Sequence, residues 1–299
     1  MASLTLNFIR RRHHPLVRRT AGPITTGGLL LMAIAVTTAC ETPATTTQND
    51  PSEELACAQR TIGGESGDRV KSLRITAARV PAADAATEMP GGETIVIGLP
   101  DRYRDERTSV LSVSSTTFMS IHVLDGMKAG WVDEMDGQPL SRTAATDVIE
   151  RGRQEFARAL VLWLLRDSPA FPVQWSVGDP PNTPAGRRTP NNRVSIRAAG
   201  PDGFNARLLV DALTCHPVAF EYERPATLSD RRAEQQSNVT VLSDTRLEHI
   251  DLIEYRSFSG VMFPTVLRRS IESRPVSEER VTDIKVNPAL NTNEFQLPH

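Results

Sequence analysis

Apolar and polar residues alternate along much of the chain after residue 70, and such alternation is typical of β-strands. In the first of these stretches, Leu73, Ile75 and Ala77 are separated by charged or polar residues. Asp125-Gly126 stands between two later stretches and marks a hairpin turn, because both residues tolerate a positive φ. About ten stretches can be counted, and strands with one apolar face form antiparallel sheets. We therefore expect a mainly β protein with some helix, built on a curved antiparallel sheet or incomplete β-barrel.

Residues 144–166 have the periodicity of a helix instead. Apolar residues such as Phe156 and Leu160 recur there at steps of three and four. The opposite face is polar and carries Glu150, Arg151, Arg153, Gln154, Glu155 and Arg158. The last part of the segment is apolar on every side, so it contacts apolar material on more than one side. We therefore expect this helix, with a shorter one that ends before Gly63, to cover the apolar face of the sheet.

A helix over a curved sheet can enclose a space for a guest molecule. If it does, we expect these apolar side chains to line that space: Ile75, Ile95, Ile97, Met119, Ile121, Phe156, Leu160, Trp163 and Leu164. The alternative is that Phe156, Trp163 and Leu164 fill the space as an ordinary core. The Arg and Glu residues of the stretch 103–113 and His122 are expected on the polar face of the sheet.

The N-terminus resembles a bacterial lipoprotein signal. Residues 1–39 contain two arginine clusters and then an apolar run, 27–36, which is too short for the ~20 residues that cross a bilayer. The run ends on small residues before Cys40. The resemblance implies cleavage before Cys40 and acyl chains, palmitate among them, on its thiol and new amine, which hold the protein on a membrane. The alternative is ordinary signal-peptide cleavage that leaves Cys40 free.

This organisation divides the chain into three parts. Residues 1–39 are the signal peptide, residues 40–54 are a polar tether, and residues 55–299 form one folded domain. Of the three cysteines, Cys57 and Cys215 remain in the folded domain. In an oxidising compartment such a pair favours a disulfide, and two buried free thiols are the alternative.

Composition excludes several classes of function. The 299 residues have a formal net charge of −2, and five arginines but no acids lie in the first 39 residues. The rest of the chain is therefore more acidic, which argues against a nucleic-acid partner. The sequence has no Cys-x-x-Cys, His-Glu-x-x-His or Gly-x-Ser-x-Gly motif and no phosphate-binding glycine loop. We expect no enzymatic activity, no metal site and no cofactor.

The C-terminal third carries a series of motifs in a definite order. The stretch 202–217 ends in Asp211-x-x-Thr214-x-x-Pro217, and Tyr255-Arg256, Gly260-Val261-Met262-Phe263-Pro264, Val286-Asn287-Pro288 and Phe295 follow. In this order the motifs resemble the lipoprotein-carrier (LolA/LolB-like) superfamily, including relatives described as outer-membrane lipoprotein-sorting proteins. The resemblance implies an incomplete barrel with a helical lid over an apolar cavity, which holds acyl chains of lipids or lipoproteins in the periplasm.

Together these features predict a lipid-anchored domain of the bacterial cell envelope, on the periplasmic side. Its partners would be a membrane, through acylated Cys40, and a lipid or acylated protein, with a role in lipoprotein or lipid trafficking. The outer membrane is favoured over the inner one because Glu41, rather than aspartate, follows Cys40. The alternative function is a non-catalytic sensor or scaffold that binds another envelope protein, through the long polar segment 224–243 for example.

Overall fold

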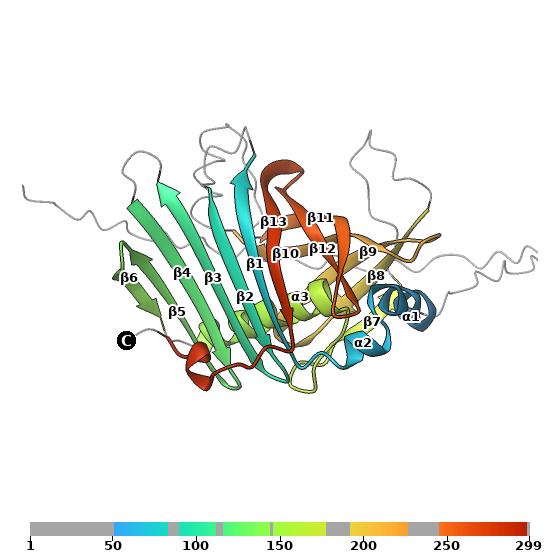
Figure 1. Ribbon diagram of the computed structural model, residues 1–299, viewed down its shortest axis with the longest axis horizontal. Coiled ribbons are helices and arrows are strands. Elements are labelled where there is room, and N and C mark those ends of the chain that lie inside the picture. Colours follow the sequence, from blue (N-terminus) through green and yellow to red (C-terminus); the bar gives the residue numbers. More distant parts are fainter. Residues whose placement is uncertain are drawn as a thin grey trace, which may run out of the picture. The chain divides into compact units, whose positions relative to one another are not determined.

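The computed structural model describes residues 51–82, 90–111, 116–143, 146–177, 192–226 and 245–297, which all belong to one compact unit, Thr47–His299. Thirteen strands form a single antiparallel sheet, in the spatial order β6-β5-β4-β3-β2-β1-β13-β12-β11-β10-β9-β8-β7 (Figure 1). The strands are β1 (Ser72–Pro81), β2 (Gly91–Gly98), β3 (Arg102–Leu111), β4 (Thr116–Asp125), β5 (Lys128–Met135), β6 (Gln138–Thr143), β7 (Gln174–Val177), β8 (Arg193–Ala199), β9 (Asn205–Asp211), β10 (Pro217–Pro225), β11 (Thr245–Phe258), β12 (Val261–Ile271) and β13 (Arg274–Val286).

The strand order confirms the predicted open antiparallel sheet. Consecutive strands pair as hairpins in each half of the chain, and Gly126 takes a positive φ of 60° in the expected β4–β5 turn. The first and last strands also pair, with Ile75 of β1 opposite Ile284 of β13. This pairing joins the two halves into one sheet. Within the described part of the chain, the two edge strands β6 and β7 do not pair with each other, so the sheet is not closed.

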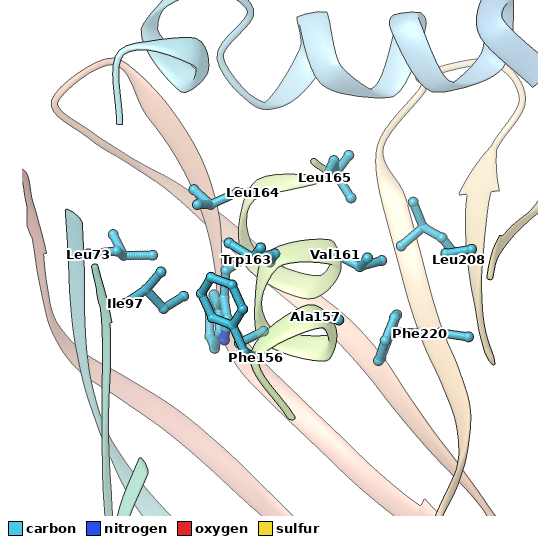
Figure 2. Close-up of a cluster of buried hydrophobic side chains, with 14 of the residues drawn as sticks. Leu73, Ile97, Phe156, Ala157, Val161, Trp163, Leu164, Leu165, Leu208 and Phe220 are labelled. Carbon is cyan, nitrogen blue, oxygen red and sulfur yellow. The ribbon is translucent and has the colours of Figure 1, made fainter. Parts of the chain in front are cut away.

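The predicted long helix is α3 (Thr146–Leu164), which connects one edge strand, β6, to the other, β7. In Figure 2 it lies between the strands that carry Leu73 and Ile97 and those that carry Leu208 and Phe220. We call the sheet face that meets α3 the inner face and the opposite one the outer face. Among the described residues, no helix has both the length and the apolar character needed to span a membrane.

The other helices are short. Helix α1 (Pro51–Ile62) contacts β7, β8 and β12, and α2 (Glu65–Asp68) follows it. Because α1 begins at Pro51, the last residues of the expected tether are helical. Two 3₁₀ turns, η1 (Pro201–Gly203) and η2 (Thr292–Phe295), complete the elements.

Apolar side chains gather on both faces of the sheet. The larger cluster lies on the inner face and includes Phe156 and Val161 of α3, which lie between side chains from the two halves of the sheet (Figure 2). The smaller cluster lies on the outer face, where Phe295 of η2 packs on Val96 and Val123. The residues after β13 therefore cover part of the face that an isolated sheet would expose.

Candidate binding site under helix α3

The inner face changes from apolar to charged along its strands. On β2, Glu93 lies at the charged end, and Ile95 and Ile97 follow it on the same face toward the apolar end. All three are buried. On the neighbouring strand β3, Tyr103 pairs with Ile97 and Arg107 pairs with Glu93. The same change occurs on β12, where Leu267 precedes Arg269 by one pleat. One end of the inner face is thus apolar, and the other end is charged.

The charged end forms a continuous group of ionic side chains, which we call the charged belt. It consists of Glu93, Asp105, Arg107, Glu248, Arg269 and Glu279 from the sheet and Glu155 and Arg158 from α3. Its carboxylates on the sheet are deeply buried, with Asp105 and Glu248 each 2% exposed. Burying such charges is costly unless they are paired, so each needs a partner of opposite sign.

Two arginines provide most of that pairing. Arg107 lies 2.8 Å from Glu93 (Nε to Oε1) and 3.0 Å from Asp105 (Nη2 to Oδ2). Arg269 lies 2.6 Å from Glu248 (Nη1 to Oε1) and 3.0 Å from Glu279 (Nη2 to Oε1). Each guanidinium is therefore shared by two buried carboxylates, which is the geometry that its forked donors permit.

Sharing one arginine separates the proton affinities of the two acids. Burial raises the pKa of Asp105 to about 7. Arg107 acts in the opposite direction and lowers it, but the nearby Glu93 carboxylate adds to the effect of burial. Burial acts in the same direction on Glu93, but Arg107 and Arg269 outweigh it and lower the pKa of Glu93 to about 2. Burial also opposes ionisation of Glu248, whose pKa is nevertheless lowered to about 2, chiefly by Arg269.

Helix α3 is fastened to the sheet by side chains. Arg158 donates to the hydroxyl of Tyr222 on β10 and pairs with Glu155 on its own helix. Nearer the start of α3, the Arg151 guanidinium lies 4.7 Å from the ring centroid of Trp131 on β5. In the described ranges, no backbone hydrogen bond joins α3 to a strand. The position of the helix therefore depends on apolar packing and on a few arginines.

A small cavity lies between α3 and the sheet, where the apolar and charged ends meet. Its volume is about 20 Å³, and its lining includes Tyr103, Trp163, Ile250 and Arg269. That volume suffices for about one water molecule. Sites for ligands of drug-like size are on the order of 300–1,000 Å³. This cavity, lined by described residues of α3 and the sheet, is too small for an acyl chain in this conformation.

Most of the residues expected to line a ligand cavity lie together in the inner cluster. These are Ile75, Ile95, Ile97, Phe156, Leu160, Trp163 and Leu164, all buried. Met119 and Ile121 lie elsewhere, in the outer cluster with Phe295, and their inclusion in the lining is corrected. On β4 the alternation places His122 and Leu124 inward and Met119 and Ile121 outward. Residues after β13, among them Phe295, cover Met119 and Ile121 on the outer face. Both faces of β4 therefore carry buried side chains, and apolar character alone could not identify the inner face.

The charged belt was missed in the sequence. Arg107 was expected on the polar face of the sheet and Glu155 and Arg158 on the polar face of the helix, but all three belong to the charged belt between α3 and the sheet. His122 also points inward, with Nε2 3.3 Å from the Ser120 hydroxyl, and burial lowers its pKa to about 4. The sequence contained a signal for their position. Asp105 and Arg107 lie on the same face of β3 as Tyr103, and a large aromatic side chain indicates the buried face of a strand.

The cysteines form one bridge. Cys57 of α1 and Cys215, in the turn between β9 and β10, are joined by a disulfide with a Cα–Cα distance of 5.6 Å. The bridge fixes α1 to the C-terminal half of the sheet. Cys40, the predicted site of acylation, lies outside the described residues, as does most of the polar segment 224–243. No group of three or more metal-binding side chains occurs in the ranges that the structure describes.

Comparisons with known proteins give similarity in structure only. No protein-family model matches the chain, and no curated protein matches it in sequence. A LolA superfamily protein from Nitrosomonas europaea is similar at 13% identity with a TM-score of 0.43, covering 83% of this chain and 98% of that chain. A DUF1329 family protein from Desulfovibrio piger is similar at 10% identity with a TM-score of 0.41, covering 83% and 98%. We draw no argument from scores of this size.

Proposed function

We propose that the protein is a lipid-anchored protein of the bacterial envelope that binds a hydrophobic ligand, the acyl chain of a lipid or lipoprotein, between α3 and the apolar end of the inner face. The lipoprotein-like signal that ends at Cys40 supports the anchor. The order of the C-terminal motifs supports the ligand class. The proposed role is non-enzymatic and contributes to lipid or lipoprotein trafficking at the periplasmic side of a membrane, the outer one being favoured.

The observation that carries the proposal is an open sheet whose cover is held by side chains alone. Because β6 and β7 do not pair in the described chain, α3 can move outward without breaking a ladder hydrogen bond. Its inward residues, among them Phe156 and Leu164, would then uncover the apolar end of the inner face (Figure 2). An acyl chain placed there would replace contacts of the helix at about 25 cal/mol per Å² of buried apolar surface.

The cavity of about 20 Å³ is too small for an acyl chain, so a ligand can bind under α3 only if the helix moves away from the sheet. A Cβ atom placed on Gly152 of α3 would lie 3.3 Å from the Cβ of Ala129 on β5. Disulfides have Cβ–Cβ separations of about 3.8 Å, so the double variant Gly152→Cys/Ala129→Cys can tie the helix to the sheet. In the oxidised form of this variant α3 cannot move away from β5.

The experiment measures the binding of a fluorescent fatty acid to this variant before and after reduction. We expect reduction to strengthen binding at least about tenfold. The wild-type protein with and without reductant is the matched control, because reductant also acts on the Cys57–Cys215 bridge. Equal binding by the oxidised and reduced variant would refute movement of α3, and absence of binding by the wild type would refute the ligand.

The anchor has an independent test. The mature N-terminal peptide should begin at Cys40 and carry the mass of its acyl chains, and Cys40→Ser should release the protein from the membrane fraction. An unmodified Cys40 in the mature protein would refute the anchor while leaving the ligand proposal intact.

A second candidate function is a non-catalytic sensor or scaffold that binds an envelope protein. The small size of the described cavity under α3, about 20 Å³, favours it, because a scaffold needs no room for a guest. For a scaffold, the oxidised Gly152→Cys/Ala129→Cys variant should still replace the wild type in cells. For a ligand carrier, the oxidised variant should be inactive.

A further inference from the structure

Two polar side chains at the small cavity are buried without a hydrogen-bond partner. Tyr103, on β3, is 1% exposed and Trp163, on α3, is 4% exposed, and both line the cavity. Within the described residues, neither the Tyr103 hydroxyl nor the Trp163 Nε1 has a partner, and the Nε of Arg269, which also lines the cavity, has none, although its two other nitrogens are paired. Buried polar atoms are nearly always bonded, so two such groups at one cavity point to an acceptor that they would share.

The charges around the cavity indicate what kind of acceptor fits. Of the charged lining residues, Glu93 is paired with Arg107, Glu279 with Arg269, and Arg158 with Glu155. The guanidinium and carboxylate charges of the lining are equal in number. A fully charged group placed there would lack a counter-ion, whereas a neutral oxygen acceptor would not disturb the balance.

The remaining lining is apolar and continues into the inner cluster. Ile95, Ile250 and Leu267 line the cavity and belong to the inner cluster, and Leu162, also in the lining, packs against that cluster. An acceptor oxygen at this place would therefore be attached to an apolar group that extends toward the apolar end. A long-chain acyl group has this combination, with a neutral carbonyl oxygen at one end of a hydrocarbon chain.

We infer that the ligand is recognised by its acyl carbonyl, whose oxygen accepts hydrogen bonds from the Tyr103 hydroxyl and the Trp163 indole. This rests on the proposed function and deepens it, because it distinguishes acylated molecules from other apolar guests. Tyr103 would stay on the sheet when α3 moves, and Trp163 would close on the ligand from the helix. The ester of a glycerolipid and the amide of an N-acylated protein share this carbonyl.

Three probes of equal chain length separate these chemistries: monolaurin (an ester), dodecylglycerol (the ether without the carbonyl) and N-lauroyl glycinamide (an amide). Binding to the exported chain carrying Cys40→Ser is measured by calorimetry. We expect the ester and the amide to bind about fivefold to tenfold more tightly than the ether. The tighter of the two carbonyl probes indicates whether a glycerolipid or an acylated protein is the natural source.

Tyr103→Phe should remove most of this preference, because it deletes one hydroxyl and no existing hydrogen bond. Tyr255→Phe is the matched control: its hydroxyl donates to the carbonyl of Pro217, and it does not line the cavity. Trp163→Phe is a second variant that should also weaken the preference.

Equal binding of ester, amide and ether by the wild type would overturn the inference while the proposed function stands. A preference unchanged in both Tyr103→Phe and Trp163→Phe would also overturn it, and failure of all three probes to bind would refute the proposed function itself.

Discussion

Arg158 of α3 donates a hydrogen bond to the hydroxyl of Tyr222 on β10, with 2.5 Å between Nη1 and Oη. The same guanidinium lies 4.9 Å from the centroid of the tyrosine ring and pairs with Glu155. One side chain thus joins the helix to the C-terminal half of the sheet, while Arg151 holds the helix to β5 in the N-terminal half. The helix is placed by contacts to both halves.

Replacing Arg158 with Met should destabilise the protein by about 3–5 kcal/mol, since Glu155 and the Tyr222 hydroxyl would lose their buried partner. Urea denaturation measures this loss. Glu150→Ala, at an exposed position of the same helix, should change stability by less than about 0.5 kcal/mol. A similarly small effect of Arg158→Met would show that the charged belt does not hold α3.

His249 on the outer face should make stability depend on pH. Hydrogen bonds to Asp251 and Glu221, at 3.1 and 2.9 Å, raise its pKa to about 9, although burial opposes the shift. Because the folded-state pKa is raised, this stabilisation is complete below about pH 6.5 and is lost as the pH rises through about 9. His249→Gln should therefore destabilise the protein more at about pH 6 than at about pH 10 in urea unfolding. An equal effect at both pH values would contradict the assigned ion pairs.

The Cys57–Cys215 disulfide should contribute strongly to stability because 158 residues separate its ends. The double variant Cys57→Ser/Cys215→Ser should lose about 5 kcal/mol in denaturant unfolding, by the chain-entropy relation for a loop of that length. Mass analysis of the untreated protein should show it lighter than the reduced form by one pair of hydrogens. Two thiols that react with an alkylating agent in the oxidised protein would exclude the bridge.

The outer cluster should contribute to stability and not to ligand binding. Phe295→Ala should cost about 3–5 kcal/mol, since the ring is buried against Val96 and Val123. Under conditions where the variant is folded, its affinity for a fluorescent fatty acid should equal that of the wild type. Gln296→Ala, at the exposed neighbouring position, is the control for stability. A large loss of affinity in folded Phe295→Ala would contradict this and would show that the outer cluster takes part in ligand binding.

Local patterns predicted most of the elements, but about ten strands were expected and thirteen form, with the short edge strands β6 and β7 not predicted. The alternation of Leu73 and Ile75 gave β1, and the steps between Phe156 and Leu160 gave α3, because each pattern reflects burial on one side of a regular backbone. Such local patterns could not predict the pairing of β1 with β13. It joins residues about two hundred positions apart, for which no turn motif exists.

The assignment of faces could be predicted only where one face is polar. Around Met119 and Ile121 both faces are buried, so the more apolar set was placed inward although it packs under Phe295. Along β3, Asp105 and Arg107 alternate with Arg104 and Glu106, and both sets are charged. The inward set is tolerable because Arg107 pairs with Asp105 on its own strand and with Glu93 on β2, and sequence alternation along β3 does not show these pairs.

The pairing of β1 with β13 also bears on how the chain reaches this structure. Strands β1 to β6 can form as a local meander soon after synthesis, but the free edge of β1 has no partner until the last strand has been made. During that interval β1 presents unpaired backbone groups, which are the usual starting point for strand exchange between molecules. Completion of the sheet is therefore the step at which neighbouring nascent copies compete with the correct fold.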